Sequence, residues 1–233
     1  NPFECVKTNV IGAMNVIDAC IDGGVKKVVA LSTDKASNPA NLYGATKLTS
    51  DKLFIAGNAY VPSDETKFSV VRYGNVMDSR GSVIPFFQSL KDKDTLPITD
   101  IDMTRFLISL TQGIELVINA FSDMVGGEIY VKKIPSILVT DIAKAIAPNA
   151  KIKVIGIRPG EKIHEQMISI EDSPYTYEYD GYYKVLPSIH GWSHDPKRIK
   201  DGSLVKSNFV YASNTNEHWM SVEELRAIIN KTA

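Results

Sequence analysis

A tyrosine and a lysine four residues apart, Tyr43 and Lys47, lie in the chemically most informative stretch of the chain, residues 31–47. On a helix, side chains with this spacing share one face. A tyrosine is a poor base at its ordinary pKa of about 10, but a neighbouring cation stabilises the phenolate and lowers that pKa. The pair is therefore a candidate for general acid–base chemistry.

Three polar residues, Ser32, Thr33 and Asp34, directly follow the short apolar run 27–31. The run predicts a buried strand, and open parallel sheets bind ligands just beyond the carboxyl ends of their strands. A hydroxyl, a carboxylate, an ammonium group and a phenol thus converge on one crevice. A lone Tyr-x-x-x-Lys is usually an exposed helix pair, but its place after this strand favours catalysis.

A second candidate group, Arg158 and Glu161, belongs to an Arg-Pro-Gly-Glu segment. Its proline and glycine predict a helix over residues 161–168, whose free N–H groups and dipole favour an anion. The guanidinium of Arg158 suits a phosphate, and the carboxylate of Glu161 can accept from ribose hydroxyls. Arg80 and Arg105 are further candidates for a pyrophosphate.

Helices and strands alternate over residues 3–73 with short connections, which is typical of a parallel α/β sheet. The pattern of Ser221 to Glu224 is a capping box that opens a final helix, whereas residues 172–220 predict loops and short strands. The expected helices cover residues 3–21, 42–58, 83–90, 107–121, 140–147, 161–168 and 221–230, and the expected strands cover 27–31, 67–73, 128–132 and 151–157.

The overall composition disfavours several classes of partner. There are 26 Lys and Arg against 27 Asp and Glu, without the basic excess of most nucleic-acid binders. No apolar run approaches the roughly 18 residues of a membrane span, and Cys5 and Cys20 cannot form a disulfide framework. His190 and His194 are four apart, but a glycine and a proline beside them argue against the helix that would align them, so no metal is expected.

Residues 31–47 resemble the extended short-chain dehydrogenase/reductase superfamily, in which a Ser or Thr after a strand joins Tyr-x-x-x-Lys. Asn9, Gly12 and Asn15 match the preceding helix of that superfamily. Within it, the Thr-Asp-Lys triplet at 33–35 is similar to that of the nucleotide-sugar 4,6-dehydratases. The resemblance continues to the end of the chain through RYGNV at 72–76, SRGSVIPFF at 79–87, DMTRF at 102–106 and RPGEKIHE at 158–165.

The resemblance implies a role for each residue of the first group, acting on a UDP-sugar. Tyr43 takes the proton of the 4-hydroxyl as hydride leaves carbon 4, and Lys47 lowers the Tyr43 pKa and holds the nicotinamide ribose. Lys35 removes the proton on carbon 5, Asp34 protonates the departing 6-hydroxyl, and Thr33 hydrogen-bonds near O4. Lys35 then reprotonates carbon 5 from the opposite face. Membrane-attached retaining relatives usually carry Met in place of the tyrosine, which favours the soluble inverting branch.

The resemblance also implies the ligands and their contacts. The cofactor is NADP, with NAD possible, and the expected state is a cytoplasmic homo-oligomer that serves surface-glycan or flagellin glycosylation, with no nucleic-acid or membrane partner. The residues expected to bind the cofactor are Asn9, Ser32, Tyr43, Lys47, Tyr73, Asn75 and Val76. The residues expected to bind the substrate are Thr33, Lys35, Asn75, Arg80, Ser82, Val83, Arg105, Arg158 and Glu161.

The implied fold is α/β, a doubly wound, Rossmann-like parallel sheet with a smaller α+β substrate domain. Residues 1–75 would be the C-terminal part of the dinucleotide-binding domain, with 107–133 packing back onto it, and 76–233 mainly the nucleotide-sugar-binding domain. The sequence contains no Gly-rich dinucleotide turn, and only 31 residues precede Ser32. We therefore expect the N-terminal strands to be missing, and the chain alone to be poorly soluble, without measurable NADP affinity or activity.

Two other functions remain open. A nucleotide-sugar epimerase or reductase of the same superfamily needs Thr33, Tyr43 and Lys47 but has no use for an adjacent acid and base. Asp34 and Lys35 are therefore the discriminating residues. A non-catalytic remnant that binds a nucleotide sugar or a partner subunit is the alternative from another class. The absent glycine-rich turn supports it, and the intact Thr-Asp-Lys triplet argues against it.

Overall fold

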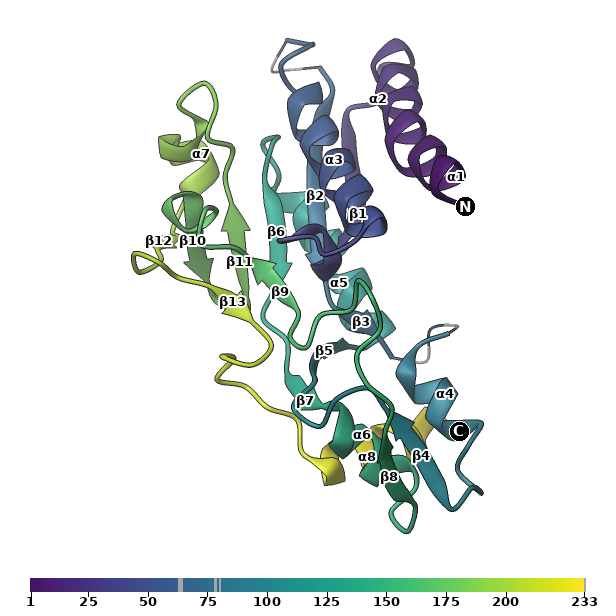
Figure 1. The fold of residues 1–233 in the computed structure, drawn as a ribbon. Coiled ribbons are helices and arrows are strands. Elements are labelled where there is room, and N and C mark those ends of the chain that lie inside the picture. Colours follow the sequence, from purple (N-terminus) through teal and green to yellow (C-terminus); the bar gives the residue numbers. More distant parts are fainter. Residues whose placement is uncertain (63–64, 78, 80, 233) are drawn as a thin grey trace. The chain divides into compact units, whose positions relative to one another are not determined.

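The computed structural model describes residues 1–62, 65–77, 79 and 81–232 of the chain. The chain folds into two compact units, each assembled from three separate segments (Figure 1). Unit 1 comprises Asn1–Tyr73, Thr111–Lys133 and Gln166–Tyr211, and unit 2 comprises Gly74–Leu110, Ile134–Glu165 and Ala212–Ala233.

A six-stranded sheet forms the centre of unit 1, in the order β1-β2-β6-β11-β10-β12. The first three strands are parallel and the other three continue the sheet in antiparallel pairs. These strands are β1 (Lys27–Thr33), β2 (Lys67–Tyr73), β6 (Ile129–Lys132), β11 (Tyr182–Val185), β10 (Thr176–Tyr179) and β12 (Ser203–Leu204). The predicted α/β class with a parallel sheet is confirmed.

Helices cover both faces of the parallel strands, because successive strand residues point to opposite faces. On one face, the rings of Phe54 in α3 and Phe68 in β2 lie 6.2 Å apart. On the other face, Leu116 and Ala120 of α5 pack with Val71. The helical segments that accompany this sheet are α1 (Pro2–Val6), the π-helix η1 (Lys7–Ile11), α2 (Gly12–Asp22), η2 (Asp34–Ala36), α3 (Leu42–Gly57), α5 (Leu110–Asp123), η3 (Ser173–Tyr175), η4 (Trp192–His194) and α7 (Pro196–Ile199).

Unit 2 is built from short strands and helices around its own apolar core. β3, β5 and β7 form one small sheet, and β4 pairs with β8 in parallel. Its elements are β3 (Asn75–Val76), α4 (Val83–Gln88), β4 (Thr95–Ile98), β5 (Thr104–Ile108), β7 (Ser136–Leu138), α6 (Val139–Ile146), β8 (Lys151–Val154) and α8 (Val222–Thr232). The core includes Ile84, Phe87, Ile98 and Leu107 with Ile142 of α6 and Leu225 of α8.

The predicted capping box of the last helix is confirmed. The backbone N–H of Ser221 donates to Glu224 Oε2 at 2.8 Å, and the N–H of Glu224 donates to Ser221 Oγ at 3.2 Å. α8 begins at the next residue, Val222. These reciprocal bonds satisfy N–H groups that a helix start leaves without partners.

Two predicted helices differ from the structure. Residues 104–108 form strand β5, so the helix expected from residue 107 begins only at Leu110. Phe106, Leu107 and Ile108 are all buried, as in a strand covered on both sides. The helix expected over 161–168 is absent, and that stretch holds turns and strand β9 (Gln166–Ile168).

The division of the chain differs from the expected one in residues 166–211. The sequence assigns them to the second domain, whereas they belong to unit 1. The reason is strand pairing, because β11 pairs with β6 and brings β10 and β12 into the same sheet. Residues 111–133 lie in unit 1 as well.

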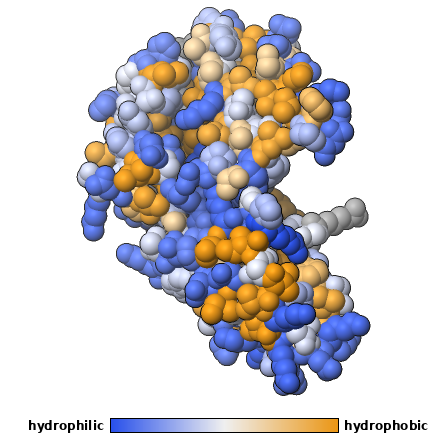
Figure 2. All heavy atoms as spheres, viewed as in Figure 1, coloured by the Kyte–Doolittle hydropathy of each residue, from blue (hydrophilic) through white to orange (hydrophobic). Residues whose placement is uncertain are grey.

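Large apolar side chains gather on the outer surface of α1, η1 and α2, where Phe3 is 77% exposed. Figure 2 shows orange spheres over α2. In the described part of the chain, no helix is both long and apolar enough to cross a membrane. The exposed apolar residues of these three helices include Phe3, Val6, Ile11, Met14 and Val16.

Candidate active site

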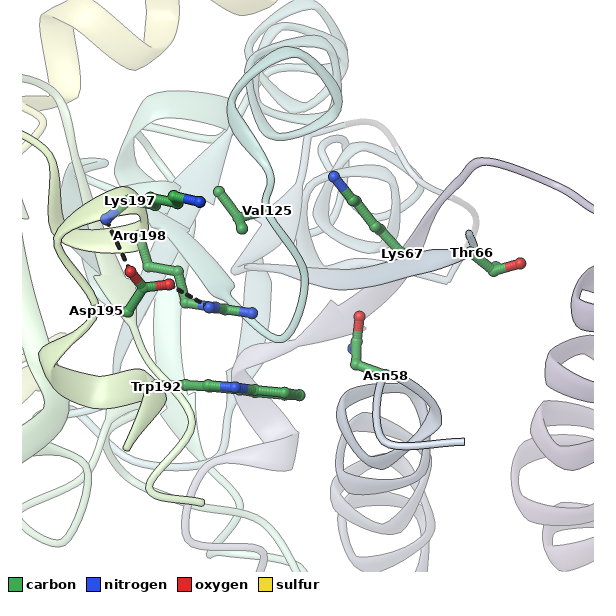
Figure 3. Close-up of a pocket in the computed structure, with 8 residues that line it drawn as sticks. All are labelled: Asn58, Thr66, Lys67, Val125, Trp192, Asp195, Lys197 and Arg198. Carbon is green, nitrogen blue, oxygen red and sulfur yellow. Dashed lines mark hydrogen bonds and ion pairs between the residues drawn. The ribbon is translucent and has the colours of Figure 1, made fainter. Parts of the chain in front are cut away.

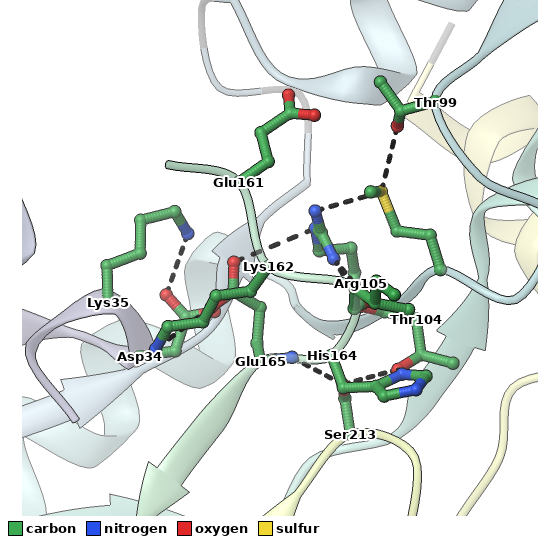
Figure 4. A network of polar contacts seen from close by, with 12 residues as sticks. Asp34, Lys35, Thr99, Thr104, Arg105, Glu161, Lys162, His164, Glu165 and Ser213 are labelled. Atoms are coloured by element: carbon green, nitrogen blue, oxygen red, sulfur yellow. Dashed lines mark hydrogen bonds and ion pairs between the residues drawn. The ribbon is translucent and has the colours of Figure 1, made fainter. Parts of the chain in front are cut away.

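The carboxyl end of β1 forms a tight cluster of Thr33, Asp34 and Lys35. The Thr33 hydroxyl donates to Asp34 Oδ1 at 2.8 Å. Lys35 Nζ donates to the same oxygen at 2.9 Å (Figure 4). Asp34 is fully buried, whereas the Lys35 side chain is 36% exposed. Asp34 Oδ2 is buried without a hydrogen-bond partner among the described residues. The acid thus lies beneath an accessible ammonium group.

Tyr43 is brought to this cluster by the start of α3. Asn41 caps the helix, since its Oδ1 accepts from the N–H of Gly44 at 2.9 Å. A Cβ at Gly44 would lie 2.4 Å from the carbonyl oxygen of Lys35, so only glycine permits this close approach. The Tyr43 side chain next to it remains accessible, with the residue 45% exposed.

The electrostatics of Tyr43 differ from the expectation. Partial burial raises the pKa of its phenol above the ordinary value; Lys35 acts in the opposite direction, and Asp34 adds to the increase. Lys47 was expected to be the cation that lowers this pKa. Its Nζ instead donates to the carbonyl oxygen of Leu31 at 2.8 Å, and Lys35 is the cation that acts on Tyr43.

A buried ion pair lies one helical turn beyond Lys47. Asp51 Oδ2 accepts from the hydroxyl of Ser32 at 2.7 Å and from Arg72 Nη2 at 3.2 Å. Asp51 and Arg72 are each 2% exposed. Burial raises the pKa of Asp51 more than the charge of Arg72 lowers it. The cluster joins α3, β1 and β2, and Ser32, expected at the cofactor, uses its hydroxyl here.

Asp51 and Arg72 were missed as parts of the site. The signals are present in the sequence, because Asp51 follows Lys47 by four residues and Arg72 begins the RYGNV segment. Arg72 also donates from Nη1 to the carbonyl oxygen of Met167 at 2.7 Å. Its partners lie 21 and 95 residues away in the chain, so only the folded structure reveals them.

Two further residues expected at the cofactor lie next to α3. Asn9 donates from Nδ2 to Thr46 Oγ1 at 3.0 Å, and Thr46 in turn donates to the carbonyl oxygen of Tyr43 at 2.8 Å. Asn9 therefore braces the helix that carries the tyrosine. Tyr73 ends β2, and its pKa is raised first by burial and then by the charge of Tyr43.

In unit 2, Arg105 is surrounded by acceptors of its own unit (Figure 4). Its Nη1 donates to the carbonyl oxygens of Thr104 at 2.7 Å and Ile163 at 3.1 Å, and its Nε lies 3.9 Å from Glu165 Oε1. Its side chain is only 12% exposed. Arg105 thus holds the segment 158–165 against β5, in addition to any contact with a ligand.

Arg158 and Glu161 are paired with each other. Arg158 Nη1 lies 3.7 Å from Glu161 Oε1, and the N–H of Arg158 donates to Glu161 Oε2 at 3.3 Å. The Arg158 side chain is 65% exposed. Because no helix starts here, the expected helix dipole does not contribute to anion binding, and Arg158 remains as an exposed guanidinium.

The other expected substrate residues lie in β3 and at the start of α4. Asn75 and Val76 form β3, which pairs with β5, and Val83 is the first residue of α4. Ser82 precedes it, and its buried hydroxyl has no hydrogen-bond partner in the described part of the chain. Arg80 lies outside the described residues.

His190 and His194, which are four residues apart, each contact a nearby side chain of another type. The ring of His190 packs at 5.3 Å from that of Trp192, and His194 Nδ1 lies 3.0 Å from Ser193 Oγ. Among residues 1–62, 65–77, 79 and 81–232, no three His, Cys, Asp or Glu side chains are grouped as a metal site requires.

The chain is similar to known proteins over nearly its whole length. The chain is 54% identical over its full length to a UDP-N-acetylglucosamine 4,6-dehydratase (inverting) of Campylobacter jejuni subsp. jejuni, of which it covers 72%. It is 44% identical over 98% of its length to a UDP-glucose 4-epimerase of Rickettsia canadensis, of which it covers 68%.

A solved structure and a family model complete the comparison. An X-ray structure of Pen from Bacillus thuringiensis superposes with a TM-score of 0.88 at 37% identity, covering all of this chain and 71% of that one. A model of the family described as polysaccharide biosynthesis protein matches residues 1–187. The chain therefore belongs to this polysaccharide biosynthesis family.

Proposed function

We propose that the chain is a nucleotide-sugar 4,6-dehydratase, a hydro-lyase. It converts UDP-N-acetylglucosamine to a UDP-linked 4-keto-6-deoxy-L-arabino N-acetyl sugar, with inversion at carbon 5. The single observation that carries the proposal is the contact of Lys35 with the buried Asp34 beside Tyr43. The 54% identity to a dehydratase of this specificity supports the choice of sugar.

The first step is loss of a proton from the 4-hydroxyl of the sugar. Tyr43 accepts it as the phenolate, since its side chain is accessible and the ammonium group of Lys35 favours the charged form. Thr33, whose hydroxyl lies within 2.8 Å of Asp34, is positioned to hydrogen-bond near the same oxygen. The ketone that would form at carbon 4, once a hydride has also left for the nicotinamide, makes the proton on carbon 5 acidic.

The second step is loss of water across carbons 5 and 6. Lys35, in its neutral form, takes the proton from carbon 5, and Asp34, in its acid form, protonates the departing 6-hydroxyl. The buried Oδ2 of Asp34 has no partner among the described residues and can carry that proton. A proton is finally returned to carbon 5 on the face opposite the one from which Lys35 removed it, which inverts this centre.

The site also fits one end of a nicotinamide dinucleotide. The ammonium of Lys47 and the hydroxyl of Tyr43 are one helical turn apart, and such donors suit the hydroxyls of a nicotinamide ribose. When bound, this cofactor would take a hydride from carbon 4 and return it to carbon 6, so that no net redox occurs. On the family resemblance we propose NADP, with NAD as the alternative, and a cytoplasmic homo-oligomer.

The uridine diphosphate is assigned to Arg158 and Glu161. Arg158 presents an exposed guanidinium whose only ion-pair partner in the described part of the chain is Glu161, at 3.7 Å. A diphosphate carries more charge than this carboxylate and can accept bidentate hydrogen bonds from the guanidinium. Glu161 would then be released to accept hydrogen bonds from ribose hydroxyls.

A UDP-sugar 4-epimerase is the second candidate, favoured by the 44% identity to an epimerase of Rickettsia canadensis. Such an enzyme uses Tyr43 and Lys47 but removes no proton from carbon 5. The two functions separate in deuterium oxide, because a dehydratase places solvent deuterium on carbon 5 and an epimerase places none there.

The deciding experiment follows this exchange by NMR in full-length protein supplied with NADP and UDP-N-acetylglucosamine. Lys35→Ala should abolish deuterium incorporation at carbon 5, with substrate affinity changed less than about threefold. Lys52→Ala serves as the matched control, since Lys52 is an exposed lysine of α3 away from the cluster. Normal exchange in Lys35→Ala would show that Lys35 is not the base.

A further inference from the structure

A cavity of about 430 Å³ lies in unit 1 at the amino end of β2 (Figure 3). The catalytic cluster occupies the carboxyl end of β1, and β1 and β2 are parallel, with Lys27 opposite Lys67 and Thr33 opposite Tyr73. The cavity and the cluster therefore lie at opposite ends of these parallel strands. The lining residues are Asn58, Thr66, Lys67, Val125, Trp192, Asp195, Lys197 and Arg198.

The guanidinium of Arg198 forms one wall of the cavity, and its neighbours hold it in place. Arg198 donates from Nε to the carbonyl oxygen of Gly126 at 2.9 Å, and its Nη1 forms an ion pair with Asp195. Its guanidinium carbon lies 4.5 Å from the centre of the Trp192 ring, a cation–π contact. Figure 3 shows it between Val125 and Trp192. Arg198 is 8% exposed, so its position is set by packing.

The charges that line the cavity do not balance. Among the described lining residues, Asp195 is the only carboxylate, and its two oxygens accept from Arg198 Nη1 and, at 3.0 Å, from the backbone N–H of Lys197. The ammonium groups of Lys67 and Lys197 have no hydrogen bond or ion pair with the described residues. Two positive charges are thus left to solvent or a ligand, in a chain whose net charge is -1.

We propose that this cavity is a second ligand site that takes a small phosphate-bearing anion, separate from the nucleotide-sugar site. Two ammonium groups on facing elements, β2 and α7, match an anion with two or more negative charges and several acceptor oxygens. A diphosphate or a phosphate monoester has this chemistry. The fixed guanidinium of Arg198 and the indole of Trp192 give the anion a preformed wall.

The test uses fluorescence, because the chain has two tryptophans and one lines the cavity. In the full-length Trp219→Phe variant, Trp192 is the tryptophan of this chain that remains, so its emission reports on the cavity. Titration with inorganic pyrophosphate should give a saturable change in emission, weakened by 0.5 M salt. Lys67→Met and Lys197→Met should each raise the Kd about tenfold, whereas Lys52→Met, at an exposed lysine elsewhere in unit 1, should not.

A second titration with uridine monophosphate distinguishes a phosphate monoester from a free diphosphate. Binding of either anion that is lost in the double variant Lys67→Met/Lys197→Met supports the proposal. No saturable change with either anion up to about 10 mM would overturn it, as this corresponds to a Kd too weak for a built site. An equal response in the double variant would also overturn it, because the anion would then bind elsewhere.

Discussion

Asp34 in unit 1 and Arg158 in unit 2 are held in opposite ways. In unit 1, Asp34 is fully buried and bonded to Thr33 and Lys35, and the helix that carries Tyr43 is anchored by a buried ion pair. In unit 2, the side chain of Arg158 is 65% exposed and contacts one carboxylate. On the proposed function, the reacting groups are thus positioned before the substrate arrives, whereas the diphosphate contacts form when it binds. Changes in unit 1 should act on kcat, and changes in unit 2 on KM.

The largest effect is expected for Tyr43→Phe in unit 1. Loss of the phenolic hydroxyl removes the group that accepts the proton from the 4-hydroxyl, so kcat should fall at least about 1,000-fold. Rapid mixing with substrate should then show no absorbance of reduced nicotinamide. Tyr60→Phe is the matched control, since Tyr60 is 73% exposed and lies outside the site. A Phe variant that still reduces the cofactor would place the first base elsewhere.

The buried pair of Arg72 and Asp51 gives the next largest effect, on stability. Arg72→Met leaves an uncompensated buried carboxylate and should lower the free energy of unfolding by about 3 kcal/mol. Burial raises the pKa of Asp51 more than Arg72 lowers it, so the pair does not fully offset its own desolvation. The double variant Asp51→Leu/Arg72→Met should therefore recover at least half of the loss in urea unfolding. Equal instability of the single and double variants would contradict this account.

Arg158→Ala tests unit 2 and should be milder. The variant loses a guanidinium that binds the diphosphate in ground state and transition state alike, so KM should rise about tenfold with kcat within twofold. Steady-state kinetics at varied UDP-N-acetylglucosamine measures both constants. Lys153→Ala, at an exposed lysine of β8 in the same unit, should change neither. A fall in kcat at unchanged KM would mean that Arg158 acts in the chemical step, against the comparison drawn above.

Local patterns predicted unit 1 better than unit 2. Strand β2 has the expected bounds, and α3 ends one residue before its expected end, because an apolar run and an Asn cap mark these elements within a few residues. Strand β5 was hidden, since Phe106, Leu107 and Ile108 form an apolar run that merges with the helix after it. Such a run indicates burial without deciding between strand and helix.

Of the candidate site, too, one part was predicted from the sequence and another part was not. Thr33, Asp34 and Tyr43 were predicted from their places after a strand and at the start of the following helix, and Lys35 was predicted from the family resemblance. The ion pair of Asp51 with Arg72 was not found, since it depends on how α3 packs on β2. The pairing of Arg158 with Glu161 without a helix was also missed, because proline and glycine mark a turn as well as a helix start.

The smallest effect is expected at the start of α8 in unit 2, where Ser221 and Glu224 bond to each other at the surface. Ser221→Ala removes the helix cap and should speed amide exchange in α8 about fivefold relative to the parent protein, with no change in α3 of unit 1. Bonds from the backbone N–H and the hydroxyl of Ser221 hold the pKa of Glu224 below its ordinary value. A lowered pKa contributes stability above the unfolded pKa and loses it as pH falls through the folded pKa. The ratio of exchange rates between variant and parent should therefore be largest near pH 7 and decline below about pH 4. A ratio that stays constant down to pH 3 would mean that the serine hydroxyl alone, without the carboxylate, stabilises the helix start.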